Sequence, residues 1–259
     1  MIDLHCHILP GVDDGASDLN EALEMARIAQ NEGIKKIVNT SHFHPDFKFK
    51  MGQILQEEVN NFNLELKKNN IDIEVLLGNE LYYYSDLIES LDDLDFYTIN
   101  NSKYILIEFS PVNVPKNLSD IVYEFKLKGY TPILAHVERY SLIMENPNII
   151  YDCINEGAVI QVNASSVLGK HGKEMKKVAD ILLDNNMVQI IASDSHGSER
   201  RRPQLKEAYN FIKNKYSKEV ADNLFENNQS LIISNKDIIK PKISKYQERK
   251  GLFSKLFKR

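Results

Sequence analysis

The sequence has no tryptophan and only two cysteines, Cys6 and Cys153, among its 259 residues. Two cysteines are too few for the disulfide framework that stabilises small secreted domains. The chain also starts with Met1-Ile2-Asp3-Leu4, which is typical of a strand, and it lacks the basic and then apolar segment of a signal peptide. We therefore expect a cytoplasmic protein.

Long apolar runs and an excess of positive charge are also missing. No run approaches the roughly 20 apolar residues that a membrane-spanning helix needs, so any contact with a membrane is expected to be peripheral. The formal net charge is −5, which leaves no overall positive field to attract nucleic acid. Binding of nucleic acid is therefore not expected to be the main task.

The remaining composition is that of a globular protein with a large core. Apolar residues make up 42% of the chain and charged residues 27%, close to the average for folded domains and unlike the composition of disordered chains. The length exceeds that of most single domains but lies within the range of one α/β barrel. One folded domain is the default expectation.

Short β-branched segments alternate with longer segments of helical period, which indicates a mostly parallel sheet covered by helices. We predict strands at 2–5, 36–40, 73–78, 104–108, 131–135, 159–162 and 188–192. We predict helices at 19–31, 52–69, 118–128, 147–156, 173–185 and 203–215. Seven β-α steps fit either a closed barrel or an open doubly wound sheet, but no glycine-rich dinucleotide or phosphate loop follows any of the strands.

The end of the chain differs in composition from the rest. Residues 240–259 contain eight Lys or Arg and one Glu, with two Leu-Phe steps among the last cations. We therefore divide the chain into a domain at 1–240 and a basic, partly apolar tail at 241–259. A solvated terminus is one interpretation of the tail, and a short amphipathic anchor for an acidic partner or a membrane surface is the other.

The first predicted strand ends in His5-Cys6-His7. Because side chains alternate along a strand, the two imidazoles point to the same side and can bind one metal ion together. The same alternation turns Cys6 away from them, so its thiol is expected to pack in the interior and to take no part in catalysis.

Imidazoles and carboxylates also follow or end most of the other predicted strands. Parallel strands of a barrel deliver their C-terminal ends to one mouth, so these groups are expected to meet there. Such a ligand set suits Mn, Zn or Fe(II), and two or more ions would stabilise the attacking and leaving oxygens of a displacement at phosphorus. The candidates are Asp13, Asp14, His42, His44, Glu80, Glu108, His136, Asp194 and His196.

Arginines lie in two of the loops at the same expected mouth. Arg139 follows His136 by three residues, and Arg200, Arg201 and Arg202 follow His196. Guanidinium groups bind phosphate oxygens in bidentate fashion, so the arginines predict a phosphoryl substrate. Neither cysteine is followed by arginine in the Cys-x5-Arg pattern of thiol phosphatases, which argues against a covalent cysteine intermediate.

The motifs together closely resemble one branch of the PHP (polymerase and histidinol phosphatase) superfamily. That branch comprises the manganese-dependent bacterial protein-tyrosine phosphatases found with capsule and exopolysaccharide genes. The resemblance rests on Met-Ile-Asp-Leu-His-Cys-His-Ile-Leu-Pro-Gly-Val-Asp-Asp-Gly at the start, Thr-Ser-His at His42, Gly-Asn-Glu at Glu80, Ile-Glu-Phe at Glu108 and Ser-Asp-Ser-His at the end.

This resemblance implies a distorted (β/α)7 barrel, similar to a TIM barrel, with three Mn²⁺ ions; Fe, Zn, Mg or Co are the other candidates. Arg139 and Arg201 match the phosphate-contacting arginines, although Arg202 stands beside the second of them. The implied ligand sets are His5, His7, Glu80 and Asp194 for one ion, Asp14, His42 and His196 for another, and Glu80, Glu108 and His136 for the third.

The implied activity is hydrolysis of phosphotyrosine on protein, with the tail of a bacterial tyrosine kinase that controls polysaccharide export as the substrate. A hydroxide that bridges the metals would attack phosphorus in line. The alternatives are a small-molecule phosphatase for a substrate such as histidinol phosphate, a polymerase-linked exonuclease, an amidohydrolase and a non-catalytic scaffold. The chain departs from the family at Val137, where members usually carry proline, and His44 matches no ligand position.

Overall fold

The computed structural model places nine strands in the part of the chain that it describes, which is every residue except 45–46, 48 and 249–259. The strands are β1 (Ile2–Cys6), β2 (Lys36–Asn39), β3 (His42–Phe43), β4 (Glu74–Leu77), β5 (Glu80–Tyr82), β6 (Tyr104–Glu108), β7 (Thr131–Leu134), β8 (Val159–Asn163) and β9 (Ile190–Ala192). All of their pairings are parallel. One sheet has the order β1-β2-β4, and the other has the order β3-β5-β6-β7-β8-β9.

The two sheets close into a barrel of seven positions. Strand β3 continues β2 after two residues, and β5 continues β4 after two residues, so each pair fills one position. At the other edge the segment that follows β9 pairs with β1 and closes the barrel. The Asp194 amide donates to the His5 carbonyl at 2.9 Å, and Cys6 forms an isolated parallel β-bridge with Ser195. The predicted distorted (β/α)7 barrel is confirmed, and the open sheet is excluded.

The strands predicted at 36–40 and 73–78 continue further than expected, and each continues after a break of two residues. The Thr40 hydroxyl accepts a hydrogen bond from the Cys6 amide, and the Asn79 side chain donates to the Ser41 carbonyl. These side-chain bonds take the place of regular strand pairing at the two breaks. As a result, His42 and Glu80 lie in short strands of their own, beyond the ends of the strands that the sequence predicted.

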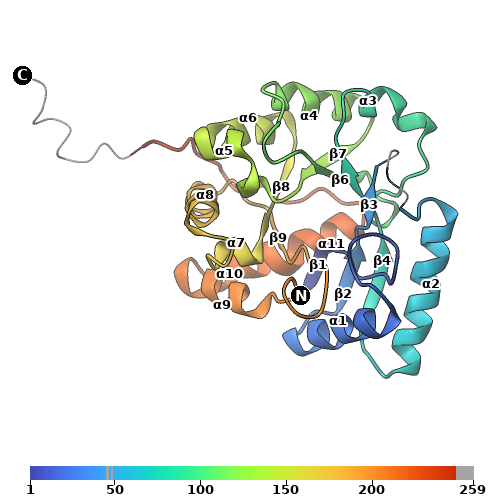
Figure 1. Cartoon of the computed structure of the whole chain (residues 1–259). Coiled ribbons are helices and arrows are strands. Elements are labelled where there is room, and N and C mark those ends of the chain that lie inside the picture. The colour runs from blue at the N-terminus through green and yellow to red at the C-terminus, as the bar shows by residue number, and fades with distance from the viewer. Residues whose placement is uncertain (45–46, 48, 249–259) are drawn as a thin grey trace, which may run out of the picture.

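Helices surround the strands (Figure 1). The six predicted helices are present with shifted ends, as α1 (Leu19–Glu32), α2 (Gln53–Lys68), α4 (Leu118–Leu127), α6 (Asn148–Glu156), α8 (Lys173–Asp184) and α9 (Lys206–Lys215). Helix α1 shows why these predictions succeed. The Asp18 carboxylate caps its first turn by accepting the Glu21 amide, and Gly33 ends it in the left-handed conformation.

Shorter helical elements fill the connections between these helices and strands. They are α3 (Leu87–Ser90), η1 (Leu91–Asp93), η2 (Ile99–Asn101), η3 (Val137–Arg139), α5 (Ser141–Glu145) and α7 (Ala164–Val167). Near the end of the chain, α10 (Lys218–Asp222), one turn of π-helix η4 (Asn223–Asn227) and α11 (Asn228–Ile233) form a continuous helical segment that the sequence did not predict.

The unpredicted helical segment covers the N-terminal end of the barrel. Ile232 of α11 packs with the barrel interior around Leu4, Val38 and Tyr104, all of them buried. The Tyr104 hydroxyl donates to the Lys236 carbonyl at 2.8 Å. This end of the barrel is therefore filled with side chains, which leaves the C-terminal end as the open mouth.

The described part of the basic tail lies against the barrel. The Lys240 ammonium donates to the Ala158 carbonyl, and the Ser244 amide and hydroxyl both donate to Asn185. The Tyr246 amide donates to the Asn148 side chain at 2.7 Å. Residues 249–259, with both Leu-Phe steps, lie outside the described residues. Among the described residues, no helix combines the length and the apolar character that crossing a membrane requires.

Candidate metal centre

The mouth of the barrel gathers imidazoles and carboxylates from six of its seven positions. Nine of the residues that the sequence singles out as ligands lie there together. Most of their side chains are buried, whereas Asp14 is 60% exposed. The nine are His5, His7, Asp14, His42, Glu80, Glu108, His136, Asp194 and His196.

Glu80 lies at the centre of this group. Its Oε2 atom lies 3.3 Å from His5 Nε2 and 3.4 Å from His7 Nε2. The same oxygen lies 3.2 Å from His42 Nδ1, and the other oxygen lies 3.2 Å from His136 Nε2. One buried carboxylate thus faces four imidazoles, which suits a ligand shared between ions.

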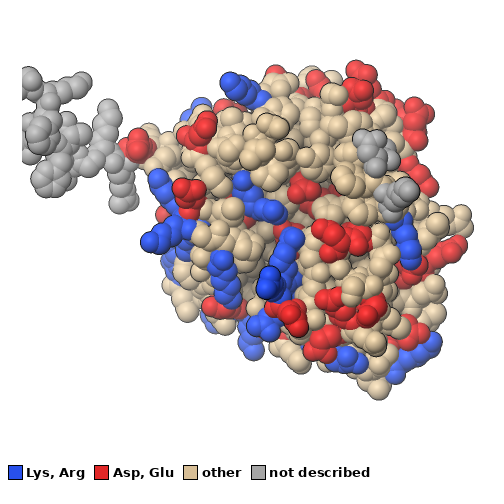
Figure 2. Space-filling view, viewed as in Figure 1, with Lys and Arg blue, Asp and Glu red and all other residues tan. Residues whose placement is uncertain are grey.

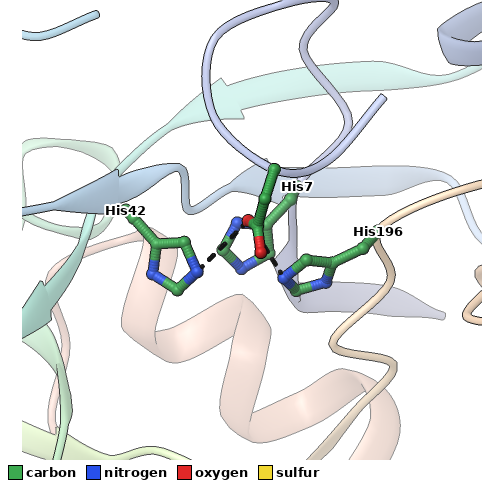
Figure 3. Close-up of side chains that lie close together, drawn as sticks. His7, His42 and His196 are labelled. Atoms are coloured by element: carbon green, nitrogen blue, oxygen red, sulfur yellow. Dashed lines mark ion pairs between the residues drawn. The ribbon is translucent and has the colours of Figure 1, made fainter. Parts of the chain in front are cut away.

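The donor atoms fall into three overlapping groups, and within each group they lie within 4.8 Å of one another. In the first, the rings of His7, His42 and His196 point toward one another from different segments (Figure 3), and Asp14 lies 3.4 Å from His42 and 3.5 Å from His196. The three groups are His7, Asp14, His42 and His196; His5, His7 and Glu80; and His42, Glu80 and Glu108.

Two further residues, His136 and Asp194, lie beside the groups to which the resemblance assigns them, and a difference from the implied sets concerns His42. His136 Nε2 lies 3.5 Å from Glu108, beside the third group, where His42 contributes its Nδ1 atom. Asp194 lies 3.5 Å from His5, beside the second group. His42 therefore faces two groups through its two ring nitrogens, a sharing that the sequence did not indicate.

Burial and neighbouring charges set the protonation of the mouth. Burial raises the pKa of Glu108 to about 7, and the charge of Glu80 adds to the rise. Burial would also raise the pKa of Glu80, but His5 and His136 beside it hold that pKa well below its ordinary value. Burial and the charge of His7 lower the pKa of His196 to about 3, so its imidazole is neutral at neutral pH.

These residues fit divalent ions. A metal ligand must offer a lone pair, and a neutral imidazole beside ionised carboxylates does so. The donors are nitrogen and oxygen, the set that Mn, Zn and Fe(II) accept. His136 Nε2 lies 3.2 Å from Glu80 and 3.5 Å from Glu108, so it is the ring nitrogen placed beside the other donors. His136 Nδ1 is buried and has no hydrogen-bond partner among the described residues.

Asp13 has a role that the pattern of residues alone did not distinguish from that of Asp14; only the resemblance to a known family selected Asp14 as a ligand. Its side chain is buried, and its Oδ2 atom lies 2.7 Å from His7 Nδ1 and accepts the His42 amide at 2.9 Å. Gly15 makes this turn possible, since a Cβ atom there would lie 2.2 Å from the His7 carbonyl oxygen. Asp13 thus orients two candidate ligands from behind.

Strand β8 contributes two further residues that the sequence missed. Gln161 Oε1 lies 3.2 Å from His5 Nδ1 and accepts the His136 amide at 2.7 Å. The Gln161 amide group donates to Asn163, whose own amide group donates to Asp194 Oδ2 at 2.8 Å. These side chains form a fully buried chain of hydrogen bonds that aims His5 and Asp194 at the mouth.

Both arginines named from the sequence converge on Asp194. Arg139 Nη1 lies 3.3 Å from Asp194 Oδ2, and Arg201 Nη2 lies 2.8 Å from Asp194 Oδ1. Arg202 is exposed and makes no ion pair with the described residues, so the geometry favours Arg201 over its neighbour. Val137, which stands where proline is usual in the family, is fully buried in the turn η3 that carries Arg139.

The backbone is strained at two of the candidate ligands. His136 has a φ of 31° and Asp194 a φ of 54°, in the left-handed region that residues other than glycine rarely adopt. Such strain persists only where surrounding contacts fix it, and it is common at functional sites. In both places the sharp turn directs the side chain into the mouth.

The remaining sequence candidates lie elsewhere. Both thiols are buried within the apolar core, as predicted for Cys6, and burial raises the pKa of Cys153 to about 12. The ring of His44 lies 5.2 Å from that of Tyr82 at the rim, and His44 belongs to none of the three groups formed by the described residues.

The chain is similar to known proteins over most of its length. A family model described as capsular polysaccharide synthesis, CpsB/CapC, matches residues 1–234. The tyrosine-protein phosphatase YwqE of Bacillus subtilis is 34% identical over 250 residues, covering 96% of this chain and 98% of the relative. The tyrosine-protein phosphatase CpsB of Streptococcus agalactiae is 35% identical, covering 91% of this chain and 99% of the relative.

Comparison with solved structures finds similarity to the same group of proteins. A chain from the crystal structures of YwqE from Bacillus subtilis and CpsB from Streptococcus pneumoniae, described as metal-dependent tyrosine phosphatases, superposes with a TM-score of 0.90. It is 33% identical, and the match covers 96% of this chain and 100% of that chain. An organophosphorus hydrolase from Deinococcus radiodurans, at 12% identity and a TM-score of 0.56, shares the fold alone.

Proposed function

Because the chain belongs to the CpsB/CapC family of capsular polysaccharide synthesis proteins, we propose that it is a metal-dependent protein-tyrosine phosphatase. The activity is that of a phosphoric monoester hydrolase. The observation that carries the proposal is the mouth of the barrel, where three groups of metal-ligating atoms lie beside two arginines. The relatives reported above are named for tyrosine phosphatase activity, so they favour this function over the small-molecule alternative.

The nine candidate ligands would hold the ions, and Mn²⁺ is the metal we propose. Divalent ions bound there would polarise the phosphoryl oxygens and lower the pKa of water. Glu80 would be the central ligand of the set, since its two oxygens face four imidazoles. Asp13 and the pair Gln161 and Asn163 would hold these ligands in place.

Arg139 and Arg201 would bind the transferring phosphoryl group. Both guanidinium groups are held by Asp194, so each is oriented before substrate arrives. Planar guanidinium groups bind two phosphate oxygens at once and neutralise charge that develops during transfer. The reaction would need no covalent cysteine intermediate, because the thiols of Cys6 and Cys153 are both buried.

The partner that we propose is a phosphotyrosine protein, namely the tail of a bacterial tyrosine kinase that regulates polysaccharide export. The proposed compartment is the cytoplasm, where such a tail would be found. Weak contact with a membrane or an acidic partner through the tail at 241–259 is part of the same proposal, and it rests on the positive charge and the Leu-Phe steps of this segment.

A substrate panel tests the activity. Purified protein with Mn²⁺ is assayed on a phosphotyrosine peptide, a phosphoserine peptide and histidinol phosphate. We expect the highest kcat/KM on the phosphotyrosine peptide, whereas a preference for histidinol phosphate would contradict the proposal. Arg201→Lys and Arg202→Lys form a matched pair of neighbours, and only Arg201→Lys is expected to lower kcat/KM, by about 100-fold.

A further inference from the structure

Two cavities adjoin the metal centre, and they differ in chemistry. One has a volume of about 130 Å³ and is lined by Asp194 together with basic side chains, among them Lys170, His171 and Arg201. The other has a volume of about 410 Å³. We call the second one the aromatic pocket, and its lining is Asp14, His42, His44, Phe47, Phe49, Tyr82 and Glu108.

The aromatic pocket is continuous with the metal centre. Three of its lining residues, Asp14, His42 and Glu108, are proposed metal ligands. Its floor therefore consists of the groups that would hold the ions, and its walls consist of aromatic rings. A ligand bound to the ions would extend directly along these walls.

The rings of the walls are arranged in contact with one another. The Phe49 ring stacks against His42 with centroids 5.8 Å apart, and the Phe47 ring lies parallel to Phe49 at 5.5 Å. The His44 ring lies 4.8 Å from that of Phe47 and 5.2 Å from that of Tyr82, so it links Tyr82 to the two phenylalanines. Phe47 is 56% exposed and stacks on Phe49, so the two rings present an apolar surface beside the metal centre.

Tyr82 is the member of the Tyr82-Tyr83-Tyr84 run that faces the site. It lies two residues after Glu80 on β5, and alternation along a strand gives both side chains the same side. The Tyr83 ring packs on Phe109 at 4.8 Å, and the Tyr84 hydroxyl lies 3.2 Å from the Ser90 hydroxyl. Tyr83 and Tyr84 therefore contact other parts of the protein, and of the three tyrosines Tyr82 lines the pocket.

We infer that the aromatic pocket binds the aryl ring of phosphotyrosine while the phosphoryl group lies at the metal centre, which makes Tyr82 and Phe49 specificity determinants. This inference rests on the proposed function and deepens it. The pocket has the volume and apolar character typical of small-molecule sites. The other cavity is lined mainly by polar and cationic side chains and suits anionic groups. An aliphatic phosphate such as phosphoserine would leave the walls empty.

Direct binding measurements test the inference without relying on turnover. The probes are phenylphosphonate and methylphosphonate, which carry the same anionic group and cannot be hydrolysed as phosphate esters. Calorimetry is carried out on the full chain saturated with Mn²⁺. The wild type is expected to bind phenylphosphonate about 10-fold more tightly than methylphosphonate, because ring contacts contribute to one and not to the other.

The variants are Tyr82→Leu and Phe49→Leu, with Tyr123→Leu, an exposed tyrosine on α4, as the matched control. Each pocket variant is expected to weaken phenylphosphonate binding about 3- to 10-fold and to leave methylphosphonate binding unchanged. Equal affinity of the wild type for the two probes, or equal losses for both probes in the variants, would overturn the inference. Protein that binds both probes as expected but fails to hydrolyse phosphotyrosine would instead overturn the proposed function.

Discussion

The Oδ2 atom of Asp13 lies 2.7 Å from the Nδ1 atom of His7, and the Asp13 side chain is fully buried. This contact leaves His7 Nε2 to face Glu80 at 3.4 Å. The same Asp13 oxygen accepts the amide of His42, so one carboxylate orients two candidate ligands that are 35 residues apart in the chain. Asp13 acts on the metal centre from behind, and its neighbour Asp14 faces the mouth.

Replacing Asp13 with asparagine is expected to weaken Mn²⁺ binding by about 10- to 100-fold, because the outer partner of a ligand imidazole fixes its orientation and raises its basicity. Calorimetric titration of metal-free protein with Mn²⁺ measures the change. Asp92→Asn is the control, since the Asp92 carboxylate pairs with Lys128 on the surface. Metal affinity equal to that of the wild type in Asp13→Asn would contradict this role.

The Asn163→Ala variant is expected to lose both folding stability and metal affinity. The Asn163 side chain is fully buried and donates to Asp194, so its removal leaves a buried carboxylate oxygen with one partner fewer. The free energy of unfolding should fall by about 1 to 3 kcal/mol, measured by urea denaturation. Asn60→Ala, on the exposed face of α2, should stay within about 0.5 kcal/mol of the wild type. Equal stability of the two variants would argue against the buried network.

Glu138 makes the stability depend on pH. Burial raises its pKa from the ordinary value of 4.5 to about 7. The folded protein therefore keeps a proton that the unfolded chain releases, so the free energy of unfolding falls as pH rises from about 4.5 to about 7. The Glu138→Gln variant has no carboxylate to titrate here. From about pH 5 to about pH 8 its free energy of unfolding should therefore rise, relative to that of the wild type, by up to about 3 kcal/mol. Urea denaturation at the two pH values measures the free energy of unfolding of both proteins. The same change between the two pH values in wild type and variant would refute the prediction.

The described part of the tail should stabilise the barrel. Truncation after Glu248 keeps the hydrogen bonds of Ser244 and Tyr246 and is expected to leave Tm unchanged. Truncation after Ile239 removes these bonds and that of Lys240, and it should lower Tm by several degrees, as a loss of about 1 to 2 kcal/mol does. Equal Tm values for both truncations would contradict this prediction and would support the domain boundary at residue 240 that the sequence predicts.

The resemblance to the PHP superfamily was sufficient to predict the barrel, because the β-α pattern alone also fitted an open sheet, and the pattern of strand ends predicted the group of residues at the mouth. Histidine and carboxylate residues recur where predicted strands end, and parallel strands bring such ends together. The pattern could not reveal Gln161 and Asn163, because uncharged polar residues in a buried strand carry no sign of what they bond. Nor could it separate Asp13 from Asp14, since only the turn at Gly15 decides which carboxylate points inward.

The helical segment α10 to α11 was missed for a different physical reason. Its buried face includes Asn228 and Gln229, which interrupt the apolar stripe that predicts an amphipathic helix. In the structure the Asn228 side chain donates to the Gln189 carbonyl at 2.8 Å, so the polar group is satisfied inside the protein. Such compensation depends on a partner 39 residues away and is invisible in the local pattern.

The most direct test of the account is to locate Mn²⁺ by anomalous scattering in crystals of the active protein. We predict peaks within the three groups of donor atoms, with one of them beside both Glu80 and His136, and we predict loss of the peaks next to residue 80 in Glu80→Gln. Crystals of active protein with no peak at the mouth of the barrel, or with peaks elsewhere alone, would contradict the central claim that these side chains bind the catalytic metals.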